Sequence, residues 1–405
     1  MPNYILFDDD VRDRLLPLTF TRPVGELRVG ILTIREKWER FLNIDRISYI
    51  TQDYLIDKFP IHIESDNIVI NGSVLPSPQL VQLISELEPN EAILKDGELI
   101  ATRLDERQFE HLINNEEIDE LGGFDAGETH FLKINYLWDI FRINGDAIQE
   151  DFELLTKNRV SQPISSTNQV IAPENIFVEE GATVECAILN ASTGPIYIGK
   201  NATIMEGAII RGGLGLCDNA TIKMGAKIYG PTTVGPFSKV GGEVGNSVLI
   251  GYSNKGHEGY MGNSVLGEWC NIGADTNTSN MKNNYDTVRL WDYSSGRFIS
   301  SGLQFCGLIM GDHSKTGINT MLNTGTVVGV SANVFGAGYP RNFIPSFSWG
   351  GTKGLTTYKT QKAFETAERM MARRNREFDE TEKKILEKVF ELTNEFRNWE
   401  KAILQ

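Results

Sequence analysis

The residue best suited to acid–base chemistry is His257, one of five histidines in the 405-residue chain. It lies in the stretch KGHEGY, where glycines flank it closely. Histidine titrates near neutral pH, so on a loop it suits the role of a general base. A loop histidine can equally be a merely exposed side chain, and the motif alone leaves both interpretations open. His313, in MGDHSKTG, is the second candidate for the base.

The composition indicates which kinds of partner and which cellular compartment to expect. The net charge of −15 argues against a nucleic-acid or anionic-membrane partner, although a few local Arg and Lys can still bind an anion. The four cysteines show no CxxC spacing, which favours buried thiols in a reducing compartment over a zinc or redox site. The start MPNYILFDDD lacks the pattern of a signal peptide, and no apolar run reaches 18 residues. We therefore expect a cytoplasmic protein without a membrane segment.

A six-residue period dominates the second half of the chain, roughly residues 178–335. Eight aliphatic residues follow one another in strict steps of six: Ile198, Ile204, Ile210, Leu216, Ile222, Ile228, Val234 and Val240. Helices have a period of 3.6 and half-buried strands a period of 2, so neither explains this spacing. Six residues fit one short strand plus one corner of a triangular coil, with the aliphatic side chain pointing inward. The sequence therefore predicts a parallel β-helix.

Two segments break this rhythm, residues 242–262 and residues 281–305. We expect both to loop out from the solenoid, where binding and catalytic groups tend to lie. The first of them contains His257.

The remaining segments complete a predicted domain layout. Residues 1–157 alternate short strand-like and helical stretches, which predicts an α/β domain with a Rossmann-like, mostly parallel sheet. Residues 158–169 read as a polar linker, residues 170–345 as the β-helix domain and residues 357–405 as C-terminal helices. The last helix is predicted to start at Asp379, with Glu382 in a capping-box-like position, and to be amphipathic through Ile403.

The segments VGPFSKVGGEV and KGHEGYMGNSVLGEWCNIGADTNTSN resemble the acetyltransferase half of the bifunctional N-acetylglucosamine-1-phosphate uridyltransferase/glucosamine-1-phosphate acetyltransferase family. The resemblance implies a left-handed β-helix and a homotrimer with sites between adjacent β-helices. It assigns His257 as the catalytic base, Tyr260 as a sugar-phosphate contact, and Asn271 and Asn280 as substrate-binding residues.

Some positions depart from the family pattern. The family's phosphate-binding arginine falls on Gly241, and its coenzyme A-contacting serine falls near Ile318. We expect Lys239, Lys255 or Arg289 to replace the missing phosphate contact.

The stretch RLLPLT, followed by Pro23, is similar to part of the sugar-phosphate nucleotidyltransferases. Their Gly-rich, phosphate-cradling loop corresponds here to residues 8–13, which begin with three aspartates and contain no glycine. Their metal-binding aspartate corresponds to Ser73. The candidates for nucleotide binding are the basic residues Arg12, Arg14, Arg22 and Arg28, and the metal ligands stay unassigned.

Together these features predict an acetyl-CoA-dependent N-acetylation of an amino-sugar 1-phosphate, with glucosamine-1-phosphate as the first choice. The resemblance pairs it with nucleotidyl transfer from UTP to give a UDP-sugar, which would need Mg²⁺. Two alternatives stay open. In one, nucleotidyl transfer is the main activity and the β-helix only a trimerising scaffold. In the other, the protein is a non-catalytic regulator that binds a sugar nucleotide.

Overall fold

A computed structural model describes residues 2–113 and 121–401. The chain forms two compact units. The first comprises Met1–Leu15, Arg22–Leu27 and Leu32–Asn135, and the second comprises Leu16–Thr21, Arg28–Ile31 and Tyr136–Gln405. By contacts, Tyr136–Gln405 form one continuous part of the second unit, which residues 16–21 and 28–31 join.

The first unit contains a six-stranded sheet. Its strands, in spatial order, are β2 (Ser48–Ile50), β1 (Asn3–Phe7), β3 (Asp66–Asn71), β5 (Glu98–Asp105), β4 (Glu91–Lys95) and β6 (Gly122–Asp125). Pairs β1–β2, β1–β3 and β4–β6 are parallel, whereas β3–β5 and β4–β5 are antiparallel. The helices of this unit are α1 (Val11–Arg14), α2 (Ile34–Leu42), α3 (Pro78–Ser85) and α4 (Glu106–Ile113). This arrangement confirms the predicted α/β class with a mostly parallel sheet.

Local sequence signals explain where α2 and α3 begin. Thr33 caps α2 in a reciprocal capping box with Glu36. Ser77 caps α3 by accepting a hydrogen bond from the Leu80 N–H, and Pro78 occupies the first turn, where no N–H is needed.

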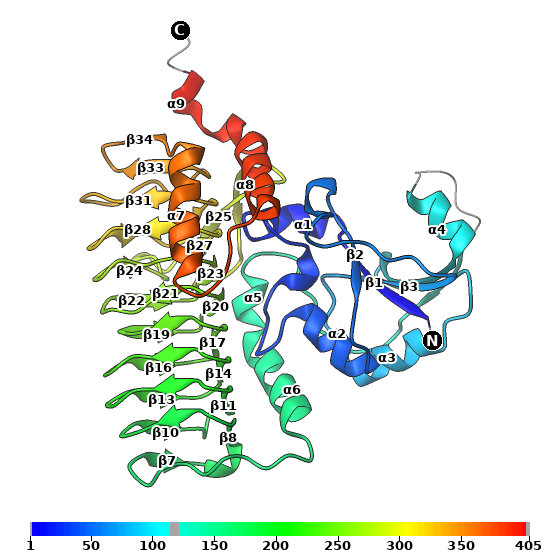
Figure 1. The fold of residues 1–405 in the computed structure, drawn as a ribbon, viewed down its shortest axis with the longest axis horizontal. Coiled ribbons are helices and arrows are strands. Elements are labelled where there is room, and N and C mark those ends of the chain that lie inside the picture. The colour runs from blue at the N-terminus through cyan, green and yellow to red at the C-terminus, as the bar shows by residue number, and fades with distance from the viewer. Residues whose placement is uncertain (1, 114–120, 402–405) are drawn as a thin grey trace. The chain divides into compact units, whose positions relative to one another are not determined.

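The second unit is built on a parallel β-helix with three faces (Figure 1). Face A, a name used here for the eight-stranded sheet, contains β7 (Gln169–Ile171), β10 (Ile188–Asn190), β13 (Ile209–Arg211), β16 (Lys227–Tyr229), β19 (Glu243–Gly245), β22 (Tyr260–Gly262), β24 (Asn277–Thr278) and β29 (Met321–Leu322). Face B, the nine-stranded sheet, contains β8 (Ile176–Val178), β11 (Ile196–Ile198), β14 (Leu214–Leu216), β17 (Thr232–Val234), β20 (Val248–Gly251), β23 (Val265–Glu268), β27 (Leu308–Met310), β30 (Thr326–Val328) and β32 (Phe343–Ile344).

Face C runs through two sheets joined by single bridges at Asn271. It contains β9 (Thr183–Val184), β12 (Thr203–Ile204), β15 (Thr221–Ile222), β18 (Lys239–Val240) and β21 (Asn254–Lys255), then β28 (Lys315–Thr316), β31 (Asn333–Val334), β33 (Ser348–Gly351) and β34 (Gly354–Thr357). Asn271 bridges Asn254 on one side and Lys315 on the other, which makes the face continuous.

The aliphatic residues that repeat every six positions form the core of the β-helix. All eight aliphatic residues in strict step are buried and belong to one hydrophobic cluster. In-register pairing stacks them coil upon coil, as Ile204, Ile222 and Val240 show on face C. The predicted left-handed parallel β-helix is confirmed.

The two breaks in the period have different structures. Residues 242–262 do not loop out, contrary to expectation. They form β19 to β22 within regular coils, and only the inward spacing changes, to four residues from Val240 to Val244 and five from Val244 to Leu249. Shorter corners therefore shift the phase of the repeat without extruding chain. Residues 281–305 do leave the solenoid, as the antiparallel hairpin β25 (Arg289–Asp292) and β26 (Arg297–Ser300).

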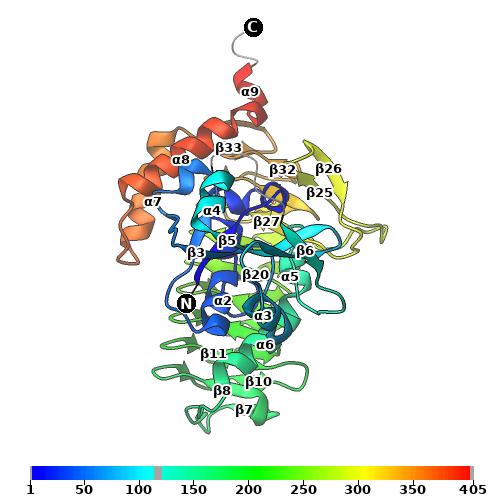
Figure 2. The ribbon, with the colours of Figure 1, turned by 90° about the vertical axis from the view of Figure 1, so that its right-hand side faces the viewer.

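Helices complete the second unit. Helices α5 (Asp139–Arg142) and α6 (Asn144–Thr156) precede the β-helix, and α7 (Thr360–Ala372), α8 (Glu380–Leu392) and α9 (Asn398–Lys401) follow it. Asp379 caps α8 through the Glu382 N–H, as the sequence indicates. The expected single amphipathic helix ends at Leu392, and Ile403 lies outside the described residues. Figure 2 shows α7 and the β25–β26 hairpin on different sides of the β-helix.

No helix in the described part of the chain is both long enough and apolar enough to cross a bilayer.

Candidate functional site

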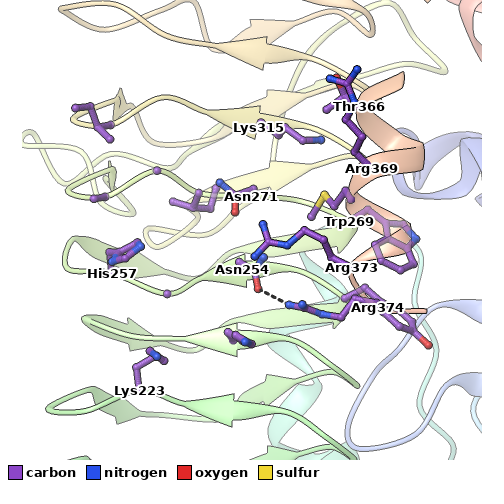
Figure 3. A pocket seen from close by; sticks show the side chains of 18 residues that line it. Lys223, Asn254, His257, Trp269, Asn271, Lys315, Thr366, Arg369, Arg373 and Arg374 are labelled. Atoms are coloured by element: carbon purple, nitrogen blue, oxygen red, sulfur yellow. Dashed lines mark hydrogen bonds between the residues drawn. The ribbon is translucent and has the colours of Figure 1, made fainter. Parts of the chain in front are cut away.

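The candidate site is a pocket of about 670 Å³ between face C and α7, within the second unit (Figure 3). Its basic lining residues are Lys223, Lys239, His257, Lys315, Arg369, Arg373 and Arg374. The rest of the lining is Tyr252, Asn254, Gly256, Trp269, Asn271, Ile272, Gly273, Ala274, Ile318, Thr366 and Met370. No carboxylate is among these lining residues, although the whole chain carries a net charge of −15.

The β-helix register places the polar wall of this pocket. Lys239 pairs with Asn254, Asn254 with Asn271, and Asn271 with Lys315, so four consecutive coils contribute one column. Each of these residues precedes an inward position by one, and side chains alternate between the two faces of a strand. The column therefore projects outward, toward α7.

Helix α7 supplies the opposite wall. Its Ala363, Ala367 and Met371 are buried, and its Arg369 lines the pocket. Arg373 and Arg374, which directly follow the last residue of α7, line the pocket as well. The Arg374 guanidinium donates to Asn254 Oδ1 at 3.4 Å, the contact drawn in Figure 3. This bond links the helix directly to the outward column.

The charges in this pocket repel one another. Burial lowers the pKa of Lys239, and the nearby Arg374, Lys223 and Arg373 lower it further. Burial and then Arg373 lower the pKa of Arg374 in the same way. Burial lowers the pKa of Lys315 to about 8, while its Nζ donates to the His313 carbonyl at 2.7 Å. A multiply charged anion would relieve this repulsion, so the pocket is suited to bind phosphate groups.

His257 lies at the edge of the pocket, in the turn that leads from β21 on face C to β22 on face A. Its side chain is exposed, and Figure 3 shows it at the end of face C away from α7. The pocket thus combines a cluster of cations with one imidazole that an incoming substrate can reach.

The other residues expected to bind the sugar phosphate divide between two faces. Lys239 and Asn271 line the pocket with His257. Tyr260 and Asn280 do not, because β22 places Tyr260 on face A, where the Asn280 amide donates to its hydroxyl at 2.8 Å. His257 occupies the corner between the two groups.

Two further candidates for the phosphate contact lie elsewhere. Lys255 is buried, and its amine donates to backbone carbonyls rather than facing the pocket. Arg289 lies in the β25–β26 hairpin and donates to the Phe298 carbonyl at 2.6 Å. Neither residue lines the pocket that contains His257.

His313, the alternative base, belongs to an aromatic stack at the corner between faces B and C. Its ring lies 6.3 Å from the Trp269 ring, which stacks on Tyr252 at 4.3 Å. His313 is buried with a left-handed backbone, φ 60°, and does not line the pocket. The structure thus favours His257 as the residue accessible to substrate.

The expected nucleotide-binding arginines do not form one cluster. Arg12, Arg14 and Arg22 belong to the first unit and Arg28 to the second. Arg12 donates to Asp13 at 2.8 Å and to the Tyr54 hydroxyl at 2.7 Å. Arg28 is buried and donates to the Ile250 carbonyl at 3.0 Å, within the second unit.

The aspartates that stand where the family has a Gly-rich loop are bonded within their own unit. Asp8 accepts from the Val24 N–H at 2.9 Å and from Thr51 at 2.6 Å, and burial raises its pKa to about 6. Asp9 accepts from the Asn71 amide at 2.8 Å. Over residues 2–113 and 121–401, no group of three or more His, Cys, Asp or Glu side chains is arranged to hold a metal ion.

Sequence reasoning missed most of the basic residues of the pocket: Lys223, Lys315, Arg369, Arg373 and Arg374. A signal for Lys315 was present, because it immediately precedes an inward hexad position, as Lys239 does. The spacing of Arg369 and Arg373 on one helix is also visible in the sequence. That α7 packs against face C could not be read from either pattern.

The chain is similar to known proteins along most of its length. Residues 4–160 match the family model described as sugar nucleotidyl transferase. A bifunctional sugar-1-phosphate nucleotidylyltransferase/acetyltransferase from Sulfurisphaera tokodaii is 34% identical over 93 residues, covering 23% of each chain. The bifunctional protein GlmU of Methanococcus vannielii is 28% identical over 210 residues, covering 49% of this chain and 41% of that protein.

A longer match comes from the bifunctional protein GlmU of Methanococcus aeolicus. It is 23% identical over 387 residues, covering 78% of this chain and 89% of that protein. The first two matches span less than half of those relatives. The chain is thus a divergent relative of bifunctional nucleotidyltransferase/acetyltransferases, which confirms the resemblance noted in the sequence.

Proposed function

We propose that the second unit transfers the acetyl group of acetyl-CoA to the amine of an amino-sugar 1-phosphate, with glucosamine-1-phosphate as the first candidate. The observation that carries this proposal is the placement of His257 at the edge of a pocket lined by six Lys and Arg side chains. The similarity to bifunctional acetyltransferases supports it.

The transfer needs only a base, an aligned pair of substrates and a site for phosphates. The amine nitrogen attacks the thioester carbonyl, and the His257 imidazole accepts the proton that the nitrogen loses. Backbone N–H donors that face the groove stabilise the oxyanion of the tetrahedral intermediate. The C–S bond then breaks, and the imidazolium returns a proton to the thiolate of coenzyme A.

The basic side chains fit the donor substrate. Coenzyme A carries a diphosphate and a further phosphate, and the mutual repulsion among Lys239, Arg373 and Arg374 is relieved when such charges bind. Asn254 and Asn271 offer amides between these cations, and the exposed Ile318 offers an apolar contact at the rim.

The test is release of coenzyme A from acetyl-CoA with a panel of amino-sugar phosphates, with the acetylated product identified by mass. We expect turnover with an amino-sugar 1-phosphate, and none with the corresponding N-acetylated sugar, which lacks the free amine. Absence of turnover across the panel would contradict the proposal and leave the β-helix as a scaffold.

For the first unit we propose nucleotidyl transfer from UTP to the acetylated sugar 1-phosphate, on the strength of the family-model match over residues 4–160. Release of pyrophosphate from UTP and N-acetylglucosamine-1-phosphate tests it. Tight nucleotide binding without pyrophosphate release would favour the regulatory alternative, because Asp8 and Asp9 occupy the place of the phosphate-cradling glycines.

The family resemblance also leads us to propose a homotrimer. Light scattering coupled to size-exclusion chromatography should give three times the chain mass of 45.3 kDa. A monomeric mass would contradict this assembly.

A further inference from the structure

Lys255 occupies a position that the six-residue period reserves for an aliphatic side chain. It follows Leu249 by six residues and precedes Met261 by six, and both of these are buried in the core cluster. In register on face C, Lys255 pairs with Val240. Its side chain is 1% exposed. Burying an ammonium group is costly unless hydrogen bonds compensate it, so the contacts of this amine need an explanation.

The amine joins two stacked turns of the β-helix. Lys255 Nζ donates to the Gly241 carbonyl at 3.0 Å and to the His257 carbonyl at 2.5 Å. Gly241 belongs to the turn between β18 and β19, and His257 to the turn one coil further on. The buried lysine therefore ties the turn that carries the imidazole to the coil beneath it.

Two glycines make room for this arrangement. A Cβ on Gly242 would lie 2.7 Å from the His257 carbonyl oxygen and 2.9 Å from Lys255 Nζ, and its φ of +68° also favours glycine. A Cβ on Gly241 would lie 2.7 Å from the Gly256 carbonyl oxygen. The Gly-Gly turn thus lets the His257 turn and the lysine amine approach closely.

The turn has few other restraints. The Asp275 N–H donates to the Glu258 carbonyl at 3.0 Å and the Glu243 N–H to the Gly259 carbonyl at 3.3 Å, while Gly256 and Gly259 flank the histidine. Within the described residues, the exposed His257 imidazole makes no hydrogen bond. Its position therefore depends on the backbone of residues 256–259, which the lysine amine holds.

We propose that Lys255 is a positioning residue that fixes the His257 turn for acetyl transfer, rather than a contact to the sugar phosphate. This inference rests on the proposed role of His257 as the base. Lys255 acts through the backbone carbonyl of His257 and touches neither substrate.

The charges around the amine are consistent with this role. Burial lowers the pKa of Lys255 to about 8, Glu258 and Asp275 raise it, and Lys227 lowers it. The ammonium form, which makes the stronger charge-assisted hydrogen bonds, is thus kept at neutral pH.

The test replaces Lys255 by Met, which the aliphatic column accommodates, and by Gln, whose amide keeps a donor. Hydrogen exchange of the Asp275 and Glu243 amides, which donate to the Glu258 and Gly259 carbonyls of this turn, is measured with kcat and the KM for acetyl-CoA. We expect exchange at these two amides to quicken about tenfold or more in Lys255→Met, with residues 219–226 unchanged as an internal reference. We expect kcat to fall about 10²-fold with little change in KM, because a misplaced base slows chemistry more than binding.

Lys255→Gln should give intermediate values of both quantities, and it carries the test if the Met variant does not fold. Lys200→Met, at an exposed position of another coil, is the control and should match the wild type. Unchanged exchange at the Asp275 and Glu243 amides overturns the inference. If wild-type turnover requires His257, an unchanged kcat in Lys255→Met also overturns the inference. If the wild type has no acetyltransferase activity, the proposed function fails, and the exchange measurement still decides whether Lys255 holds the turn.

Discussion

At the scale of single residues, Gly241 shows why the chain departs from the pattern of the acetyltransferases that it resembles. The family places a phosphate-binding arginine at this point, but any side chain here would meet the Gly256 carbonyl. The pocket instead draws its cations from neighbouring coils and from α7. The close approach of the two turns therefore explains why residue 241 is a glycine here.

Gly241→Ala tests this explanation. The added Cβ would lie 2.7 Å from a backbone oxygen, and overpacking of this kind costs about 1–3 kcal/mol of unfolding free energy. Gly256→Ala is the matched control, because a Cβ there would meet nothing within 4 Å. Urea denaturation should show Gly241→Ala to be the less stable variant. Equal stabilities of the two variants would show that the close approach is not limiting.

Asp8 gives a pH-dependent prediction for the first unit. Burial raises its pKa to about 6, so between roughly pH 4 and pH 6 the folded protein holds a proton that the unfolded chain has lost. The stability from this proton is complete below that window and is lost as the pH rises through it. The Tm of Asp8→Asn should therefore improve relative to the wild type between pH 4 and pH 7, as measured by differential scanning fluorimetry. A difference that stays constant with pH would contradict this assignment.

At the scale of elements, the strands of face C and helix α7 form opposite walls of the pocket. The strands fix a column of outward side chains at regular spacing, and the helix sets basic side chains opposite them. The hexad phase alone places Lys239 and Lys315 one residue before an inward position, but the shifted spacing between Val240 and Leu249 hides the inward position of Lys255. The hexad phase cannot show which helix covers the face, because that depends on packing of Ala363, Ala367 and Met371.

Arg369 of α7 and Arg373, the residue after its end, should control donor binding. The double variant Arg369→Gln/Arg373→Gln is expected to raise the KM for acetyl-CoA about tenfold or more, because two charge-assisted contacts to phosphate are lost. The difference should shrink as salt is added, since salt screens exposed charges. Lys362→Gln, on the same helix but outside the pocket lining, is the control. An unchanged KM, with or without salt, would place the donor phosphates elsewhere.

At the scale of the whole molecule, the sequence predicted the two architectures, but not which short segments would join each unit. The period of six defines the β-helix because every inward position must be apolar to stack, as Ile222 and Val240 do. Residues 16–21 and 28–31 join the second unit through tertiary contacts, such as the bond from Arg28 to Ile250, that leave no local pattern. The sequence motifs pointed to His257, Lys239 and Asn271, which all line the pocket. They did not point to the arginines at and after the end of α7, because these approach the pocket only through tertiary packing.

The most direct measurement is kcat for acetyl transfer to glucosamine-1-phosphate in the wild type and in His257→Ala. His130→Ala, an exposed histidine of the first unit, is the matched control. Loss of a general base predicts that kcat falls about 10²-fold or more in His257→Ala, with the control unchanged. A kcat of His257→Ala equal to that of the wild type would contradict the account, because His257 would then not act as the general base.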